Sequence, residues 1–220
     1  MRRASLLLLP LLLGCSSTGS ITYRLDIDPT VAVERSSDLT LASMRVIERR
    51  LENLGEDILE KDITFEDGAP HISLTVSDPS ALDLLTNQLT APFTLRIMEE
   101  VPEKEATIIV GVHGGFRETG ITEKHLRWVE ASTDGDVLDK GRATLQFTEE
   151  GRKLMSELFK KDKGKHIGLF VRGKLMSKLL VESDTLKDDI IIHDIPSVEF
   201  AHVFADDVNV GLYVTFSPRT

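Results

Sequence analysis

Apolar and polar residues alternate along the first stretch of the chain that predicts regular structure. In residues 21–28 (ITYRLDID) every second residue is apolar, which predicts a β-strand with one buried face. Apolar residues then recur at helical spacing, so we expect a helix that begins at Ser37 or Asp38 and stops before Gly55. The apolar positions expected to face inward on this helix are Leu41, Met44, Ile47, Leu51 and Leu54.

The pattern continues with two strands, a helix and a further strand. Residues 58–65 and 71–76 flank a turn sequence, Asp67-Gly68-Ala69-Pro70, and are typical of a hairpin. Asp78-Pro79 marks the start of a second helix, and residues 93–99 form the next strand. The order β-α-β-β-α-β is that of a ferredoxin-like fold. We therefore expect an α+β base over residues 21–103.

A second, smaller α+β block is expected over residues 104–211, followed by a closing strand and tail at 212–220. Its predicted strands are residues 107–112, 142–147, 166–171, 174–181 and 189–193, and its predicted helices are 122–129, 148–159 and 197–211. Thr122, Thr148 and Ser197 carry the hydroxyl groups that cap helices. Chain order alone does not determine which of these strands pair.

The N-terminus resembles the export signal of a bacterial lipoprotein. A basic start, Arg2-Arg3, precedes a short apolar run over residues 6–13, which is too short to span a membrane. The run ends at Gly14-Cys15, the pattern of a lipobox, in which the signal (residues 1–14) is removed and the cysteine is acylated. Residues 15–20 then form a linker. The alternative is a plain secretory signal in which Cys15 has no special role.

From the lipobox reading we expect the folded part to lie outside the cytoplasm, held to the bacterial cell envelope by lipid on Cys15. Ser16 after the cysteine favours the outer membrane if the cell has two membranes. The apolar pattern of the remaining chain contains no run of membrane-spanning length.

Composition narrows the range of functions. The chain has 220 residues and a net charge of −10, so a nucleic-acid backbone would repel it. It has only 9 Phe, 2 Tyr and 1 Trp, which are few for stacking on bases. A single Cys excludes an internal disulfide and a cysteine-rich zinc site.

Several separated segments resemble the first periplasmic domain of SecD, a component of protein export. They are Val46-Ile47 with Arg50-Leu51 and Leu54-Gly55, residues 89–96 (LTAPFTLR), Gly120-Ile121 with Leu126, residues 144–151 (TLQFTEEG), residues 164–177 and residues 200–211. They follow the family's order and span roughly residues 21–216. One departure is Arg172, where the family usually has Asp before the Gly of a hairpin.

The resemblance implies a ferredoxin-like base with a head-like subdomain, and contact with exported polypeptide or with a component of the Sec translocation machinery. The membrane helices that carry the family's proton pathway have no counterpart in this hydropathy pattern, so proton-driven work is not expected. The alternatives are a structural or adaptor lipoprotein that reuses the fold without an export role and, least favoured, an enzyme.

Few residues suggest chemistry. We expect no catalytic residue, metal or cofactor, because the six histidines show no metal-ligand spacing and no serine lies in a nucleophile-elbow sequence. His202 and Asp206 share a helix face but are more typical of a solvated surface. Trp128 and Phe116 are the aromatic residues we single out as candidates for partner binding.

Overall fold

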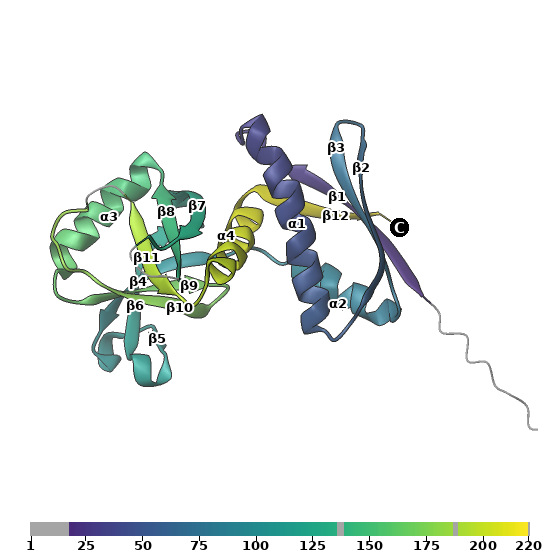
Figure 1. Cartoon of the computed structure of the whole chain (residues 1–220). Coiled ribbons are helices and arrows are strands. Elements are labelled where there is room, and N and C mark those ends of the chain that lie inside the picture. The colour runs from purple at the N-terminus through teal and green to yellow at the C-terminus, as the bar shows by residue number, and fades with distance from the viewer. Residues whose placement is uncertain (1–17, 136–138, 187–188, 220) are drawn as a thin grey trace, which may run out of the picture.

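The first sheet is the base of the molecule and has a ferredoxin-like topology. The computed structural model describes residues 18–135, 139–186 and 189–219. The base contains β1 (Gly19–Ile27), α1 (Val33–Asn53), β2 (Ile58–Glu66), β3 (Ala69–Val76), α2 (Pro79–Thr90) and β12 (Val214–Arg219). Its strand order is β12-β1-β3-β2 and all neighbours are antiparallel, while both helices cover one face (Figure 1). The predicted α+β class with a ferredoxin-like base is thus confirmed.

The fourth strand of the base is not the one expected from chain order. The strand predicted at residues 93–99 exists as β4 (Leu95–Val101), but it leaves the base and pairs with two strands of another sheet. The C-terminal strand β12 takes its place beside β1. Residues 91–213, here called the insert, therefore interrupt the ferredoxin-like fold between its second helix and its last strand.

The insert contains two further antiparallel sheets. Its elements are β4, β5 (Ile108–Ile109), β6 (Gly115–Thr122), β7 (Leu126–Thr133), β8 (Gly141–Phe147), α3 (Glu149–Asp162), β9 (His166–Val171), β10 (Lys174–Leu180), β11 (Ile190–Ile195) and α4 (Val198–Tyr213), with short 3₁₀ turns at Glu103–Glu105, Gly111–His113 and Glu123–His125. One sheet has the order β10-β9-β4-β6-β5 and the other β11-β8-β7. The large core of the insert lies between these sheets and helices α3 and α4.

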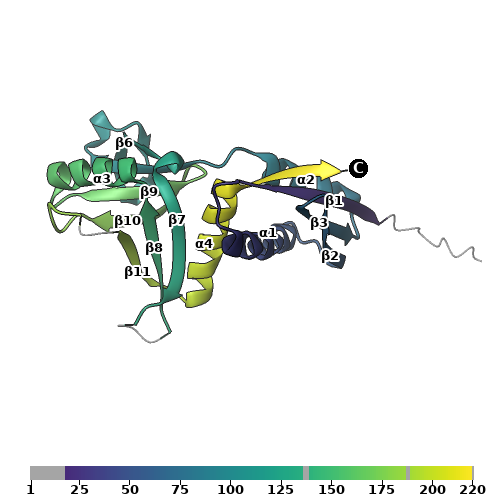
Figure 2. The same ribbon diagram turned by 90° about the horizontal axis from the view of Figure 1, so that it is seen from above.

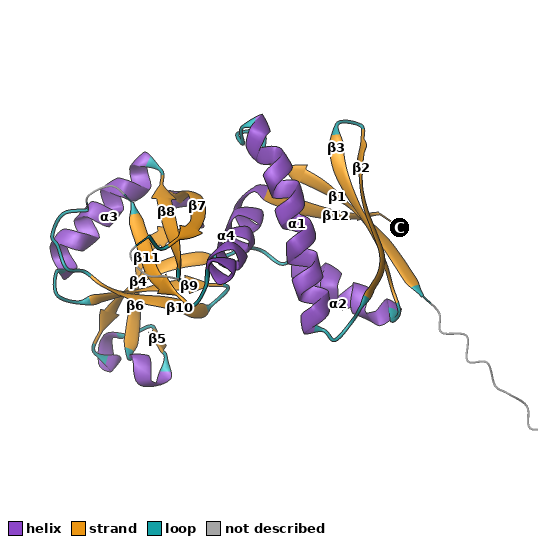
Figure 3. Cartoon of the chain, in the orientation of Figure 1, coloured by secondary structure: helices purple, strands orange, loops and turns teal. Residues whose placement is uncertain are grey.

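Helix α4 lies between the base and the insert (Figures 2 and 3). It packs against α1 on the base and against β7 and β8 on the insert, and it runs directly into β12. The backbone N–H of Asp28 donates to the carbonyl of Tyr213 at 2.8 Å, which ties the end of β1 to the end of α4. The chain thus crosses between base and insert twice, once before β4 and once at the end of α4.

Local capping signals were good predictors of helix starts. The side chains of Asp78, Thr148 and Ser197 accept backbone N–H groups at 2.9, 3.1 and 3.2 Å, as expected for N-caps. Helix α1 is different: it starts at Val33 without a side-chain cap, before the predicted start at Ser37 or Asp38. It follows a turn in which the Asp28 carboxylate accepts from the backbone N–H of Thr30 at 2.8 Å. Leu41 on this helix is 52% exposed rather than inward-facing.

The helix predicted at residues 122–129 is wrong. Thr122 caps only the single turn Glu123–His125, and Nδ1 of His125 accepts from the backbone N–H of Thr122 at 3.0 Å. The chain then extends into β7, because residues 126–133 pair with β8. Trp128 therefore lies on a strand.

Candidate functional site

Two strands of the insert have unpaired outer edges that border the same groove. Strand β10 pairs only with β9 and strand β11 only with β8, so within the described residues each ends its sheet. The groove between them has a volume of about 770 Å³. We call it the edge groove and define it by its apolar lining: Phe159, Ile167, Leu179, Leu180, Leu186, Ile190 and Ile191.

The edge groove combines exposed apolar side chains with negative charge. Leu180 is 50% exposed and Ile191 is 39% exposed, although both belong to regular strands. Glu182 and Asp189 also line the groove, while no Lys or Arg is among its described lining residues. One carboxylate oxygen of Asp189, Oδ1, is buried and has no hydrogen-bond partner among the residues described. An extended peptide with apolar and basic side chains would complement this surface.

Bulges limit the straight part of both edges. The register of β10 shifts between Leu175 and Ser177, and that of β11 shifts between Ile192 and Ile195. Bulges of this kind protect sheet edges from unwanted pairing. The regular edge therefore consists of residues 177–180 of β10 and residues 190–192 of β11, and it includes the exposed Leu180 and Ile191.

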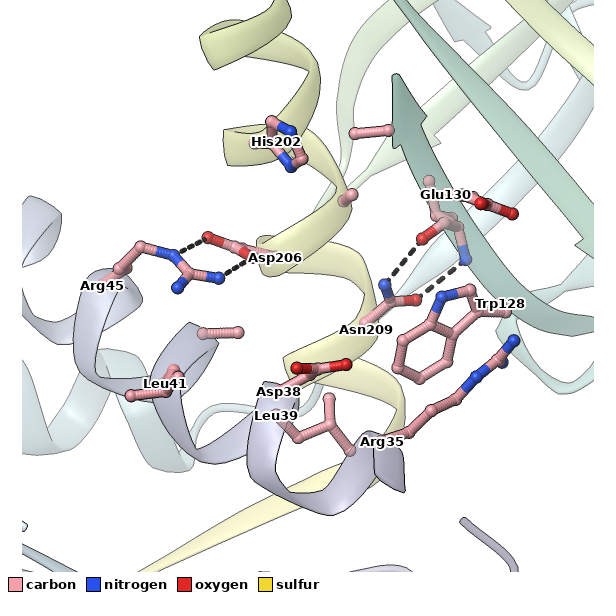
Figure 4. A pocket seen from close by; sticks show the side chains of 14 residues that line it. Arg35, Asp38, Leu39, Leu41, Arg45, Trp128, Glu130, His202, Asp206 and Asn209 are labelled. Carbon is pink, nitrogen blue, oxygen red and sulfur yellow. Dashed lines mark hydrogen bonds and ion pairs between the residues drawn. The ribbon is translucent and has the colours of Figure 1, made fainter. Parts of the chain in front are cut away.

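A second hollow, the junction cleft, lies where α1, α4 and β7 meet (Figure 4). Its volume is about 400 Å³. Arg45 of α1 donates two hydrogen bonds of 2.8 Å to the carboxylate of Asp206 on α4, and Arg49 donates to the same carboxylate at 3.4 Å. The hydrogen bond with Asp206 raises the pKa of Arg45. Asp206 is therefore engaged by two arginines, and it is not a free partner for His202 in a metal site.

Helix α4 also closes the outer edge of β7. The Asn209 side chain accepts from the backbone N–H of Val129 at 2.9 Å and donates to its carbonyl at 2.8 Å (Figure 4). The Tyr213 hydroxyl donates to the carbonyl of Arg127, the next residue that faces this edge. Asn209 thus makes the two backbone hydrogen bonds that a neighbouring strand would make with Val129. Of the three strand edges described here, that of β7 is largely occupied, whereas β10 and β11 are open.

The two aromatic residues singled out from the sequence have different environments. Trp128 lines the junction cleft, where the guanidinium carbon of Arg35 lies 4.4 Å from its ring centroid and the ring of Tyr213 lies 5.7 Å away. Its contacts thus join base and insert. Phe116 is fully buried and packs edge-on against Phe170 at 5.2 Å, so the prediction that it contacts a partner is wrong.

The predicted signal sequence and lipidation site lie outside the region that the structure describes. Cys15 and the signal sequence fall in residues 1–17, which are not described, so lipidation stays a prediction. No cluster of three metal-ligating side chains occurs in the described part of the chain. None of the helices described has the length and apolar character needed to cross a bilayer.

Comparison with solved structures finds SecDF, the protein family that the sequence segments resemble. One match, from work on the structure and function of a membrane component SecDF that enhances protein export, has 17% identity and a TM-score of 0.48 over 90% of this chain and 98% of the other. SecDF in a super-membrane-facing form and the translocon-associated SecDF of Thermus thermophilus each match at 16% identity and a TM-score of 0.49.

Those two matches cover 93% and 92% of this chain but only 30% of the SecDF chains. No protein-family model and no curated protein matches the chain.

Proposed function

We propose that this chain is a non-enzymatic, lipid-anchored module of the bacterial cell envelope that binds exported polypeptide, or a translocation partner, in an extended conformation. The edge groove is the observation that carries this proposal. An extended peptide satisfies its backbone groups by pairing with an open sheet edge, and apolar pockets beside the edge select its side chains. The SecD-like segments and the export signal support an extracytoplasmic role in protein transport.

The chemistry of the groove favours a particular kind of segment. Burying the exposed parts of Leu180 and Ile191 stabilises the complex by about 25 cal/mol for each Å² of apolar surface removed from water. Glu182 and Asp189 attract lysine or arginine side chains of the bound segment. Folded proteins hide such segments, so the groove would select unfolded chains.

Crosslinking in intact cells tests this proposal. A photoreactive amino acid is placed at Leu180 in the groove or at Leu84 on α2, which is 53% exposed and serves as a matched control. We expect adducts with several exported proteins, or with a translocation component, from Leu180 and none from Leu84. Adducts with a single envelope protein, together with normal secretion in a deletion strain, would favour the adaptor alternative.

Binding to purified protein tests the mode of recognition. A labelled apolar and basic peptide should bind about fivefold more weakly to a Leu180→Ser variant, because roughly half of one leucine contact is lost. A Leu84→Ser variant should bind like the parent. The same peptide with alternate backbone amides methylated should lose affinity, since it cannot pair with a strand edge. Equal binding of the methylated peptide would contradict edge pairing.

The lipid anchor is a separate part of the proposal. Each buried acyl CH₂ contributes about 0.8 kcal/mol, so two or more chains on Cys15 hold a protein to a membrane durably. Mass spectrometry of the mature N-terminus should find an acylated Cys15, with palmitate among its acyl groups. A Cys15→Ser variant should leave the membrane fraction. An unmodified mature terminus would indicate the plain secretory signal instead.

A further inference from the structure

A third pocket, distinct from the edge groove, lies between base and insert and carries two arginines. It has a volume of about 180 Å³. Arg50 reaches it from the last turn of α1, and Arg172 reaches it from the turn between β9 and β10. The remaining lining is apolar or neutral, including Phe93, Phe216 and Thr215, and none of the described lining residues is acidic. We call it the arginine pocket.

Neither arginine has a counter-ion among the residues that the structure describes. Arg50 and Arg172 take part in no ion pair or side-chain hydrogen bond there, and Nη1 of Arg50 is fully buried without a partner. The neighbouring Arg49 differs, because it donates to Asp207 at 3.1 Å. Asp207 is therefore already engaged, although its charge is close enough to influence Arg50.

The positive charges of Arg50 and Arg172 also repel each other. Burial lowers the pKa of Arg50, and the positive charge of Arg172 lowers it further. Arg50 is partly buried and Arg172 is exposed. A partly buried cation without a partner is unfavourable, and a second cation beside it adds to the cost. The dipole of α1 favours one cation at its C-terminal end, which accounts for Arg50. It accounts neither for the second cation nor for the unpartnered Nη1.

The position of Arg172 adds to this argument. Its φ is +50°, in the left-handed region where Gly, Asn and Asp are favoured, and it is followed by Gly173 at +77°. Its backbone N–H donates to the carbonyl of Thr94 at 2.8 Å, which fixes the turn beside the start of β4. Its guanidinium carbon lies 5.6 Å from the ring centroid of Phe93, a wall of the pocket. A long cationic side chain thus occupies a turn position that suits a short one.

We propose that the arginine pocket binds a small oxyanion of the phosphate or carboxylate type, held by Arg50 and Arg172 together. A guanidinium group presents parallel N–H donors that match two oxygens of such an anion. The anion would neutralise the charges of both guanidinium groups. Because the two arginines come from the base and the insert, a bound anion would also fasten these two parts together.

Titration of the full chain with inorganic phosphate tests the proposal, with thermal unfolding and calorimetry as measurements and sodium chloride at matched ionic strength as the reference. Phosphate should raise the unfolding temperature of the parent protein more than chloride does. Arg172→Asn should weaken phosphate binding at least about tenfold, because a charge-assisted hydrogen-bond pair is lost. Asn suits the left-handed turn, so this variant should remain folded.

Two further variants and a second anion complete the design. Arg50→Gln should weaken binding to a similar degree, whereas Arg152→Gln, on the exposed surface of α3, should leave it unchanged. A parallel titration with acetate distinguishes the ligand types: preference for either anion supports the site and identifies its chemistry. Equal binding by the parent and Arg172→Asn, or equal stabilisation by chloride, would overturn the proposal.

Discussion

Replacing Gly211 by alanine tests how base and insert are held together. Gly211 lies in α4 where the linker from α2 to β4 crosses the helix, and the ring of Phe93 rests on it. A methyl group at Gly211 would lie 2.5 Å from Cγ and 2.8 Å from Cε2 of that ring, and closer still to Cδ2. Carbon atoms in contact are normally about 3.5–4.0 Å apart, so the ring must move by roughly 1 Å.

Two opposing effects determine the size of the change. Alanine is favoured over glycine inside a helix by about 1 kcal/mol. Overpacking a filled site costs about 1–3 kcal/mol. We therefore expect Gly211→Ala to lower the free energy of unfolding by about 1 kcal/mol in the parent protein. In a Phe93→Ala background the clash is absent, so the same change should raise the free energy of unfolding by about 1 kcal/mol.

Urea unfolding of the four proteins of this cycle measures the coupling between the two positions. Far-ultraviolet circular dichroism reports on the whole fold, and the fluorescence of Trp128, the single tryptophan, reports on the junction between base and insert. The expected signature is a change of sign between the two backgrounds. If Gly211→Ala stabilises both backgrounds equally, the ring of Phe93 does not clamp the helix and this account of the junction is refuted.

Three further changes test other parts of the structure. Asn209→Ala should lower the free energy of unfolding by about 2 kcal/mol, because it strands two buried backbone groups of Val129, and faster hydrogen exchange at that amide should accompany it. Hydrogen bonds from the hydroxyl and backbone N–H of Ser80 lower the pKa of Asp78, so its stabilisation is present above its ordinary pKa and lost as the pH falls below it. The stability difference between the parent and Asp78→Ala should accordingly shrink in urea melts between pH 7 and about pH 3, and a constant difference would contradict this. Phe116→Ala should lower the free energy of unfolding by about 3–5 kcal/mol in the same melts, because Phe116 is fully buried. A loss below about 1 kcal/mol would contradict its place in the core.

Short-range patterns in the sequence predicted most elements of the fold. The caps of α2, α3 and α4 depend on a side chain and an N–H group only two or three residues away, so Asp78, Thr148 and Ser197 were sufficient to predict them. The turn at Asp67 and Gly68 was equally local, and both residues have positive φ. These features depend on contacts between residues that are only a few positions apart in the sequence.

The partners of the strands could not be predicted in this way. Residues 93–99 have the same strand-like pattern whether they complete the base or join β6 and β9, and the sequence order favoured the first. The structure favours the second, because β12, more than a hundred residues later, pairs with β1. For the same reason Asn209 was missed: its partner Val129 is 80 residues away in the sequence.

The sequence by itself determined the α+β class, most helix starts and the hairpin at Arg172, and the export signal with Cys15 stays a prediction from it. The tertiary structure alone decided which strand closes the base, which sheet edges stay open beside Leu180 and Ile191, that Phe116 is core, and that Arg50 and Arg172 share a pocket. Helix caps and turns form between neighbours in the chain. Strand pairing and pockets result from competition among distant segments for the same core, which no local pattern records.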